Sequence, residues 1–184
     1  MRKPAIFLDR DGVIIENRSN YVLSWSDVEI FDQAIETLAQ FAHLDYLFVI
    51  VTNQSPVGRG LISYADANEI NSKLISIIYE RGGRIDAAYI CPHAPSENCD
   101  CRKPRPGMLK QAAEDLSIDL SESIMIGDAL TDLKAGIQAG VKDVILLETG
   151  RGQSQAKLPE MKELTVAKRY KDLTMAFHDY FATV

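Results

Sequence analysis

The chain alternates between short apolar runs and longer stretches in which apolar residues recur at helical spacing. The apolar runs predict buried β-strands over residues 5–8, 47–51, 87–90, 123–126 and 144–147. The amphipathic stretches predict helices over residues 33–43, 64–81, 106–116 and 131–139, the second of them capped by Ser63. The tail from Thr165 predicts a strand and then a helix over residues 173–181, whereas residues 150–159 predict a surface loop.

Strands that alternate with helices in this way are typical of an α/β fold with a doubly wound, mostly parallel sheet that carries helices on both faces. The chain has 184 residues, which falls within the roughly 100–200 residues expected of one domain. We therefore expect a single domain over residues 1–184. A chain of this length buries about two thirds of its unfolded surface, so it needs no disulfide to fold.

The balance of charges narrows the classes of partner. The chain has 20 Lys and Arg against 26 Asp and Glu, a net charge of −6. We therefore expect neither a nucleic acid nor an anionic membrane as its partner. The apolar run at residues 5–8 ends at Asp9, far short of the about 20 residues of a membrane-spanning helix. With no secretory signal core either, we expect a cytoplasmic protein, and its ordinary surface composition predicts a monomer.

Polar residues follow four of the predicted strands directly. They are Asp9 to Gly12, Thr52 to Ser55, a loop that holds all three cysteines, and Gly127-Asp128. In a doubly wound sheet, ligands bind beyond the carboxyl ends of the strands. The four clusters therefore predict one binding site at that edge of the sheet.

The acidic residues of these clusters are suited to phosphoryl transfer. Asp9 and Asp11 lie two residues apart, and an extended backbone would place both carboxylates on the same side. One could attack phosphorus while the other acts as general acid for the leaving oxygen. Asp128 offers a third oxygen ligand, and such a set favours Mg²⁺. The alternative for the first pair alone is a solvated acidic turn.

Two further clusters could contact a phosphate. Thr52 and Asn53 offer a hydroxyl, an amide and backbone N–H groups at a strand end, although a simple turn with local hydrogen bonds is an alternative. Arg102 and Lys103 offer a forked guanidinium and a compact ammonium, both of which suit phosphate. Their alternative is a solubilising surface run.

The cysteine loop predicts a metal site. Cys91, His93, Cys99 and Cys101 supply three thiolates and one imidazole within eleven residues. This is a complete tetrahedral ligand set for Zn²⁺, and four protein ligands leave no open position, so the site is expected to be structural. Buried free cysteines beside a chance histidine are the alternative. A zinc-stabilised binding module remains as a non-enzymatic possibility.

Together these motifs resemble the haloacid dehalogenase superfamily of phosphotransferases. The resemblance rests on Phe7 to Val13, Val51 to Gln54, Arg102 to Pro104, and Gly127-Asp128 with Asp132 four residues beyond Asp128. Within the superfamily the chain is similar to the D-glycero-D-manno-heptose 1,7-bisphosphate 7-phosphatase family, which is close to the histidinol-phosphate phosphatases. The Cys-Pro-His and Cys-Asp-Cys-Arg-Lys-Pro segments carry this closer likeness.

The resemblance implies a role for each matching residue. Asp9 would be the nucleophile and Asp11 the general acid and base, while Thr52 and Lys103 would stabilise the phosphoryl group. Mg²⁺ would be held by the Asp9 carboxylate, the Asp11 carbonyl and Asp128, and Zn²⁺ by the cysteine loop. A sugar phosphate would be recognised by residues around the entrance, namely Asn17, Arg18, Ser19, Asn20, Tyr21, Asn53, Gln54, Ser55 and Arg102.

The spacing of the motifs also bears on access to the site. Many relatives in the superfamily carry a separate cap domain, but the intervals from Asp9 to Thr52 and from Thr52 to Lys103 are too short for one. Besides the zinc-stabilised binding module, which the four strand-end clusters disfavour, two alternatives to a sugar-bisphosphate phosphatase remain. One is a histidinol-phosphate phosphatase, and the other is a phosphoacceptor switch without turnover, which the general acid beside the nucleophile disfavours.

Overall fold

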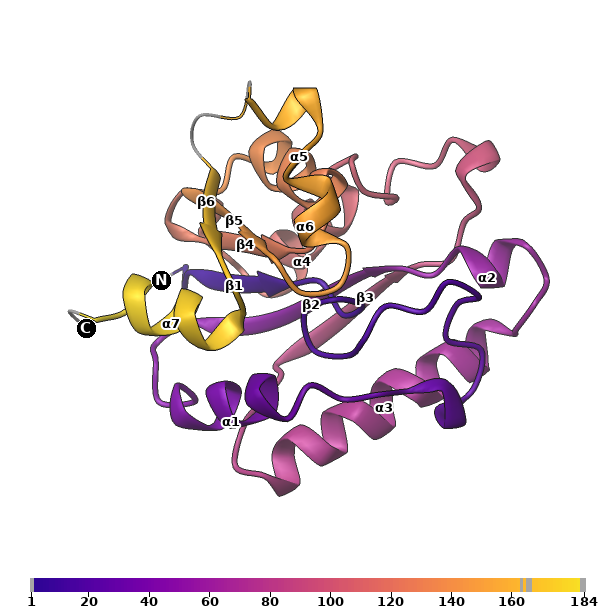
Figure 1. Cartoon of the computed structure of the whole chain (residues 1–184), viewed down its shortest axis with the longest axis horizontal. Helices are drawn as coiled ribbons and strands as arrows, with labels where there is room; N and C mark the ends of the chain where they lie inside the picture. The colour runs from indigo at the N-terminus through magenta and orange to yellow at the C-terminus, as the bar shows by residue number, and fades with distance from the viewer. Residues whose placement is uncertain (1, 163, 165–166, 183–184) are drawn as a thin grey trace.

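The computed structural model describes residues 2–162, 164 and 167–182 of the chain. Its centre is a six-stranded sheet in the order β3-β2-β1-β4-β5-β6, in which every neighbouring pair is parallel (Figure 1). The strands are β1 (Ala5–Leu8), β2 (Leu47–Asn53), β3 (Ala87–Cys91), β4 (Ile124–Gly127), β5 (Asp143–Leu147) and β6 (Ala167–Tyr170).

Helices cover both faces of this sheet (Figure 1). They are α1 (Asp32–Gln40), α2 (Ser55–Gly58), α3 (Tyr64–Glu80), α4 (Gly107–Asp115), α5 (Leu130–Ala139), α6 (Gly152–Gln155) and α7 (Leu173–Tyr180). One core cluster joins α1, α3 and α7 to the sheet, and a second joins α4 and α5 to its other face. The predicted doubly wound α/β fold is therefore confirmed.

Strand β1 shows why the strands are apolar throughout. Ile6 and Leu8 belong to the core cluster on one face, whereas Ala5 and Phe7 belong to the cluster on the other. Successive side chains of a strand point to opposite faces, and both faces of this sheet are covered by helices. The strand therefore lacks the polar alternation of a half-exposed strand.

The structure extends or corrects several predicted boundaries. Strand β2 continues to Asn53, two residues further than predicted. The predicted loop over residues 150–159 is wrong in part, because residues 152–155 form α6. A helix of four residues is too short to show apolar residues at helical spacing, so the sequence pattern did not predict it. It begins at Gly152, which lies so close to the Leu147 carbonyl that a Cβ atom would clash there. The predicted start of the tail, Thr165, lies outside the described residues.

The connections over the site edge are short. Residues 9–31 between β1 and α1 form turns and one 3-10 helix, and α2 and α3 lie between β2 and β3. No separate cap domain stands over the sheet in the part of the chain that the structure describes, as the motif spacing predicts. Among the described helices, none has the length and apolarity that crossing a membrane requires.

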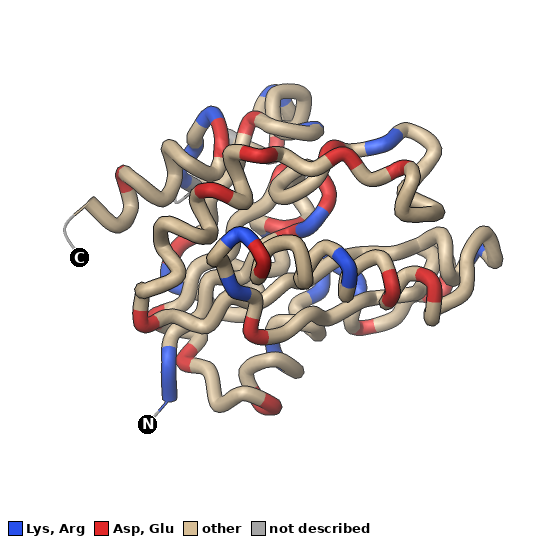
Figure 2. The backbone as a smooth tube through the Cα atoms, turned by 90° about the horizontal axis from the view of Figure 1, so that it is seen from below, with Lys and Arg blue, Asp and Glu red and all other residues tan. Residues whose placement is uncertain are grey.

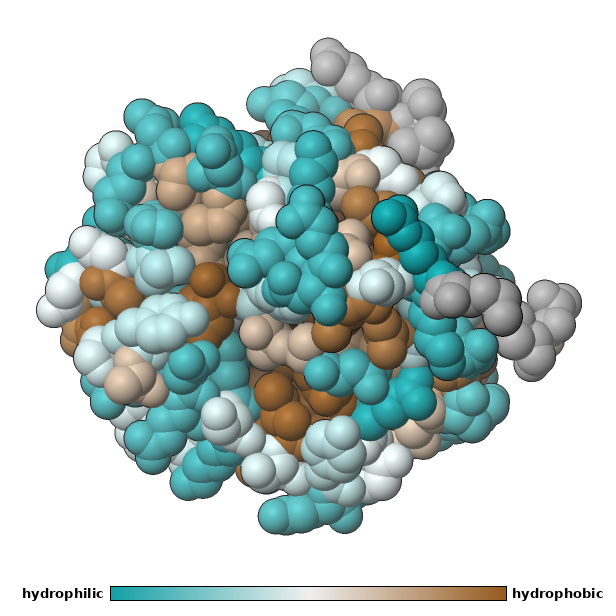
Figure 3. All heavy atoms as spheres, turned by 180° about the vertical axis from the view of Figure 1, so that it is seen from behind, coloured by the Kyte–Doolittle hydropathy of each residue, from teal (hydrophilic) through white to brown (hydrophobic). Residues whose placement is uncertain are grey.

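The surface carries charges of both signs. Acidic and basic residues are interspersed along the backbone rather than gathered into one block (Figure 2). Large apolar side chains that remain exposed are distributed over several segments, with Tyr64 and Tyr79 at opposite ends of α3; the others are Tyr21, Leu61, Ile137 and Met175. The face opposite to that of Figure 1 is largely hydrophilic, with apolar areas between hydrophilic ones (Figure 3).

Candidate active site

A cavity of about 590 Å³ opens at the carboxyl ends of the strands. Most residues predicted for the site line it, namely Asp9, Asp11, Asn17, Arg18, Ser19, Tyr21, Thr52, Asn53, Gln54, Ser55, Arg102 and Lys103. Asn20 does not line it; this residue is exposed on the entrance loop. The cavity also has lining residues that the sequence reasoning gave no role, among them Glu16, Arg59, Thr131, Asp132 and Arg151.

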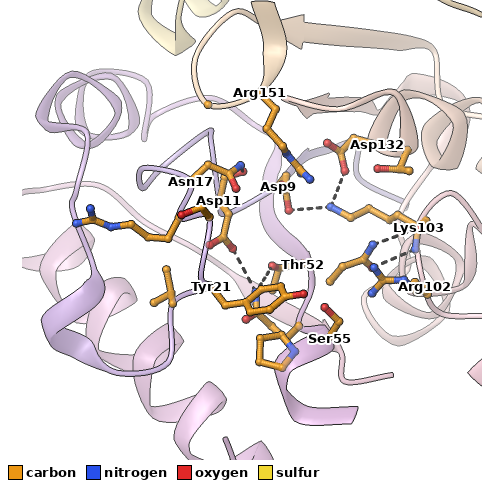
Figure 4. A pocket seen from close by; sticks show the side chains of 18 of the residues that line it. Asp9, Asp11, Asn17, Tyr21, Thr52, Ser55, Arg102, Lys103, Asp132 and Arg151 are labelled. Carbon is orange, nitrogen blue, oxygen red and sulfur yellow. Dashed lines mark hydrogen bonds and ion pairs between the residues drawn. The ribbon is translucent and has the colours of Figure 1, made fainter. Parts of the chain in front are cut away.

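Asp9 and Lys103 form the floor of the cavity (Figure 4). The Lys103 Nζ atom lies 2.8 Å from Asp9 Oδ1 and 2.7 Å from Asp132 Oδ1, and it donates to the Val51 carbonyl at 2.7 Å. Lys103 is 2% exposed and Asp9 5% exposed. One buried ammonium thus joins two carboxylates, and it orients the Asp9 carboxylate within the cavity.

Burial and the neighbouring charges have opposite effects on the pKa values of Lys103 and Asp132. Burial lowers the pKa of Lys103, but the carboxylates of Asp132 and Asp9 outweigh it and hold that pKa above the ordinary value. The side chain is therefore a permanent cation at neutral pH. Burial raises the pKa of Asp132 to about 7, against the opposing charge of Lys103.

Asp11 reaches the cavity by a different route from the predicted one. Strand β1 ends at Leu8, and beyond it Asp11 forms an isolated bridge with Ile15 across a turn at residues 12–14. The Asp11 carboxylate is directed towards Gln54, whereas that of Asp9 points towards Lys103 (Figure 4). Gln54 Nε2 donates to Asp11 Oδ2 at 3.2 Å and to Thr52 Oγ1 at 2.8 Å.

Asp128 lies beneath the cavity and is 0% exposed. Its Oδ2 atom accepts hydrogen bonds from Asn17 Nδ2 at 2.8 Å and from the Arg151 backbone N–H at 2.8 Å, and Arg151 Nη2 lies 3.1 Å from Oδ1. Burial raises the pKa of Asp128, as does the nearby charge of Asp9, while the contacts with Arg151 lower it. Gly12 permits the close approach, because a Cβ atom there would stand 2.2 Å from Asp128 Oδ2.

These acidic groups fit a small hard cation. Carboxylate oxygens of Asp9, Asp128 and Asp132 all lie within 4.8 Å of one another. The Asn17 Nδ2 atom is 3.3 Å from the Asp11 carbonyl and 2.8 Å from Asp128 Oδ2, so both acceptors face one point. An all-oxygen set with few carboxylates suits Mg²⁺. Lys103 is paired with both Asp9 and Asp132, and Arg151 with Asp128, so an ion bound here would share these carboxylates with the neighbouring cations.

The four predicted zinc ligands come together in one loop beside the cavity. Their sulfur atoms lie 3.2 to 3.5 Å apart, and His93 Nδ1 is 3.2 Å from Cys101 Sγ and 3.7 Å from Cys91 Sγ. A tetrahedral Zn²⁺ with bonds of about 2.3 Å would set the sulfur atoms about 3.8 Å apart. The ligand set is thus nearly at coordination distance. Its members are 91, 93, 99 and 101, as predicted.

This loop is tied to residues that line the cavity. Arg102, next to the last cysteine, donates from Nη1 to the His93 carbonyl at 3.2 Å. Asn53 exchanges two hydrogen bonds with the Lys103 backbone, at 3.0 and 3.1 Å. The side-chain amide of Asn53 therefore fixes the backbone of Lys103. Ser55 follows two residues later and lies buried at the start of α2, beside the cavity.

The entrance loop after β1 contributes from one side. Asn17 reaches down to Asp128, and Ser19 and Tyr21 line the cavity. Arg18 donates to the Asp27 carbonyl at 3.0 Å and lies 3.2 Å from Glu29 Oε2. Two of its donors therefore hold the entrance loop to the segment before α1.

Two important residues had little or no role in the sequence reasoning. Asp132 belongs to a quoted motif, but nothing in its spacing shows that it pairs with a lysine about thirty residues earlier in the chain. Arg151 falls in the region predicted as a surface loop. The available signal was its position, because residues 148–151 follow the end of β5 and therefore lie at the same edge of the sheet as the other clusters.

Known proteins resemble this chain in sequence and structure. A HAD-hydrolase-like family model matches residues 100–173. A D-glycero-beta-D-manno-heptose-1,7-bisphosphate 7-phosphatase from Pasteurella multocida is 39% identical over 155 residues, which is 81% of this chain and 84% of the relative. The enzyme of the same name from Helicobacter pylori is 42% identical over 144 residues, or 78% and 82% of the two chains.

A solved structure extends the likeness to the fold. The D,D-heptose 1,7-bisphosphate phosphatase from B. bronchiseptica, complexed with magnesium and phosphate, has a TM-score of 0.89 and 32% identity. The match covers 98% of this chain and 99% of that chain. The chain therefore belongs to the D-glycero-D-manno-heptose-1,7-bisphosphate 7-phosphatase family of haloacid dehalogenase-like hydrolases.

Proposed function

We propose that the protein hydrolyses the 7-phosphate of D-glycero-β-D-manno-heptose 1,7-bisphosphate through an aspartyl-phosphate intermediate. The observation that carries this proposal is the pairing of a buried Asp9 with Lys103 at the floor of a cavity that also exposes Asp11. Asp9 can act as the nucleophile, and Asp11 as the general acid and base. The β anomer follows the names of the relatives from P. multocida and H. pylori.

The reaction would proceed in two displacements. An Asp9 oxygen attacks phosphorus and forms a P–O bond while the bond to the sugar oxygen breaks, and protonated Asp11 gives its proton to that oxygen. Water then attacks the aspartyl phosphate, Asp11 takes a proton from it, and Asp9 is released with inorganic phosphate. Lys103 and Thr52 stabilise the charge on the transferring group.

Mg²⁺ would be held by the Asp9 carboxylate, the Asp11 carbonyl and Asp128. Bound there, the ion would offset the repulsion between the phosphate and the acidic floor and would orient the phosphate for attack. Asp132 lies in the same carboxylate group but also forms an ion pair with Lys103, and its role in the proposal is to hold that ammonium beside Asp9. Asn17 and Arg151, which contact Asp128 in the structure, would exchange these contacts for others when the ion binds.

Zn²⁺ would be held by Cys91, His93, Cys99 and Cys101 in a structural role. The four ligands leave no open coordination position for water or substrate. Their purpose would be to fix the loop that presents Arg102 and Lys103 to the cavity, because the Arg102 guanidinium binds the His93 carbonyl within this loop.

The rest of the cavity would recognise the sugar and its second phosphate. Arg102 lines the cavity while Lys103 serves the reacting phosphate. One guanidinium nitrogen, Nη1, donates to the His93 carbonyl, and the remaining N–H groups would bind the distal phosphate. The entrance residues 17–21 and the β2 end, residues 53–55, would contact the sugar. Of these, Asn20 would act from outside the cavity.

Turnover of a substrate panel tests the proposed function. Heptose 1,7-bisphosphate in both anomeric forms, histidinol phosphate and p-nitrophenyl phosphate are compared with Mg²⁺ and with a chelator. We expect the highest kcat/KM for the β-bisphosphate and release of the 7-phosphate, followed by phosphorus NMR. Asp9→Asn is expected to abolish turnover and keep the fold. A higher kcat/KM for histidinol phosphate, or substantial activity in Asp9→Asn, would contradict the proposal.

We further infer that the protein acts as a cytoplasmic monomer in a single domain and needs no nucleic acid or membrane partner. The scattered positions of its exposed apolar side chains support this inference. Light scattering coupled to size exclusion measures the mass directly. A dimer at micromolar concentration would contradict the monomer.

A further inference from the structure

Arg10 stands between the two reacting aspartates in the sequence but has no part in the mechanism above. Its side chain is 1% exposed and is the largest of the fully buried side chains described. A buried guanidinium destabilises a protein unless it is paired and hydrogen-bonded. The hydrogen-bond partners of the Arg10 guanidinium therefore indicate its role.

The principal partner of Arg10 is Asp11. Nε donates to Asp11 Oδ2 at 2.9 Å and Nη2 donates to Oδ1 at 3.2 Å, so the guanidinium grips both carboxylate oxygens. This two-point contact fixes the plane of the carboxylate as well as its position. A lysine could supply the charge but not the fork.

Arg10 is itself fixed from the opposite side. Its Nη1 donates to Asn71 Oδ1 at 2.8 Å, and Asn71 is a buried residue of α3 with 2% exposure. No described group accepts from Asn71 Nδ2, so the contact with Arg10 is the hydrogen bond that this side chain makes. Helix α3 thus sets the orientation of the guanidinium, and the guanidinium sets that of Asp11.

Gln54 completes the arrangement from the cavity side. It donates to Asp11 Oδ2 at 3.2 Å, and its second N–H donates to Thr52 Oγ1. Arg10 and Gln54 therefore restrain the Asp11 carboxylate directly, and Asn71 of α3 acts on it through Arg10. The Asp11 side chain remains 20% exposed to the cavity.

We propose that Arg10, anchored by Asn71, is the positioning residue that aligns Asp11 for proton transfer. This proposal rests on the proposed phosphatase function. A general acid must lie within hydrogen-bond reach of the leaving oxygen, and small misplacements of a reacting group lower rates strongly. Asp11 lies beyond the end of β1, where its backbone forms an isolated bridge with Ile15, and the direction of its carboxylate is set by the contacts with Arg10 and Gln54.

The consequence depends on the leaving group. A sugar alkoxide needs the proton from Asp11, whereas p-nitrophenolate leaves readily without it. Moreover, kcat/KM reports the steps up to formation of the aspartyl phosphate, before Asp11 acts as a base. Loss of Arg10 should therefore lower kcat/KM for the sugar phosphate strongly and for p-nitrophenyl phosphate only slightly.

The experiment compares Arg10→Met, Asn71→Leu and Asp11→Asn on both substrates with Mg²⁺. Asn68→Leu is the matched control, because this residue lies on the exposed side of the same helix. General acid catalysis contributes about 10²- to 10⁴-fold, so we expect Arg10→Met to lose about 10²-fold on the sugar bisphosphate and only a few-fold on p-nitrophenyl phosphate. Asn71→Leu should show a smaller loss with the same selectivity, and the control no loss.

A double variant separates positioning from a structural role. If Arg10 acts through Asp11, Arg10→Met adds no further loss on the sugar bisphosphate when Asp11→Asn is already present. An additional loss there, or equal losses on both substrates, would overturn the proposal. Circular dichroism checks the fold, and if Arg10→Met does not fold, Asn71→Leu decides by the same selectivity. Absence of selectivity in Asp11→Asn itself would instead disprove the proposed function.

Discussion

At the scale of single residues, the site is a balance of buried charges. Three carboxylates, from Asp9, Asp128 and Asp132, face the cations of Lys103 and Arg151. The cluster has more carboxyl groups than cations, so a divalent ion can bind there together with an anionic substrate. The two cations differ in mobility, because Lys103 is buried whereas half of the Arg151 side chain is exposed.

Arg151 is expected to compete with Mg²⁺ for Asp128. Its guanidinium lies 3.1 Å from an oxygen of the same carboxylate that would bind the ion. Arg151→Ala removes this competitor and its repulsion of the ion, so we expect Mg²⁺ to bind several-fold more tightly in the absence of phosphate. The same variant should bind inorganic phosphate more weakly, since a cation at the cavity wall is lost. Titration calorimetry measures both affinities, and weaker binding of Mg²⁺ would contradict the competition.

Arg102 is expected to serve the distal phosphate. Charge-assisted hydrogen bonds contribute about 1.5–3 kcal/mol, so Arg102→Ala should lower kcat/KM for a bisphosphate by roughly ten- to a hundredfold. It should matter far less for p-nitrophenyl phosphate, which has no distal group. Arg105→Ala is a matched control, because Arg105 donates to the Cys99 carbonyl and does not line the cavity. Equal losses on the two substrates in Arg102→Ala would place Arg102 at the reacting phosphate instead.

At the scale of elements, the strand ends could be predicted and the contacts between them could not. Apolar runs followed by polar clusters indicated the site edge, and that edge now carries Asp9, Thr52 and Asp128. The turn after Leu8 changed the direction of Asp11, because the strand is only four residues long. The pairing of Lys103 with Asp132 depends on how α5 follows β4, which no local spacing encodes.

The loop that holds Cys91, His93, Cys99 and Cys101 is expected to affect phosphatase activity indirectly, by keeping Arg102 in position. Cys99→Ser removes one of four ligands, and we expect the Zn²⁺ content of the purified protein to fall below one ion per chain. The loop would then loosen around the His93 carbonyl that Arg102 binds, so kcat/KM for the bisphosphate should fall as well. Metal analysis by mass spectrometry and kinetics on the same preparation test this. A zinc-free protein with full activity would refute the positioning role.

At the scale of the whole molecule, the order of strands gathers the site at one edge and leaves the opposite edge for stability. Each core cluster covers one face of the sheet. The residues of both clusters could be predicted from the sequence, as apolar runs in the strands and as apolar residues at helical spacing in the helices. The strand order itself was not predictable from periodicity, because that pattern does not say which strands are neighbours. The result is that β1, which carries Asp9 and Asp11 beyond its end, lies between β2 and β4 in the middle of the sheet.

This separation predicts that stability can be changed without changing the chemistry. Phe177 of α7 is fully buried, and its ring centroid lies 5.3 Å from that of Phe41 and 5.4 Å from that of Phe181. Helix α7 packs on α1 and β5, and none of its residues lines the cavity. Removing a buried phenyl ring costs about 3–5 kcal/mol of unfolding free energy, so Phe177→Ala should unfold at much lower urea concentration.

The activity of the folded fraction should stay at the wild-type value in this variant. We expect kcat/KM in buffer, corrected for the folded fraction, to be unchanged. The contacts of Asp9, Lys103 and Asp128 are made at the cavity, and no residue of α7 lines this cavity. Met175→Ala is the control, since this side chain of the same helix is 52% exposed and its loss should alter stability by less than about 0.5 kcal/mol. A fall in kcat/KM of folded Phe177→Ala would show instead that the packing of α7 reaches the reacting groups.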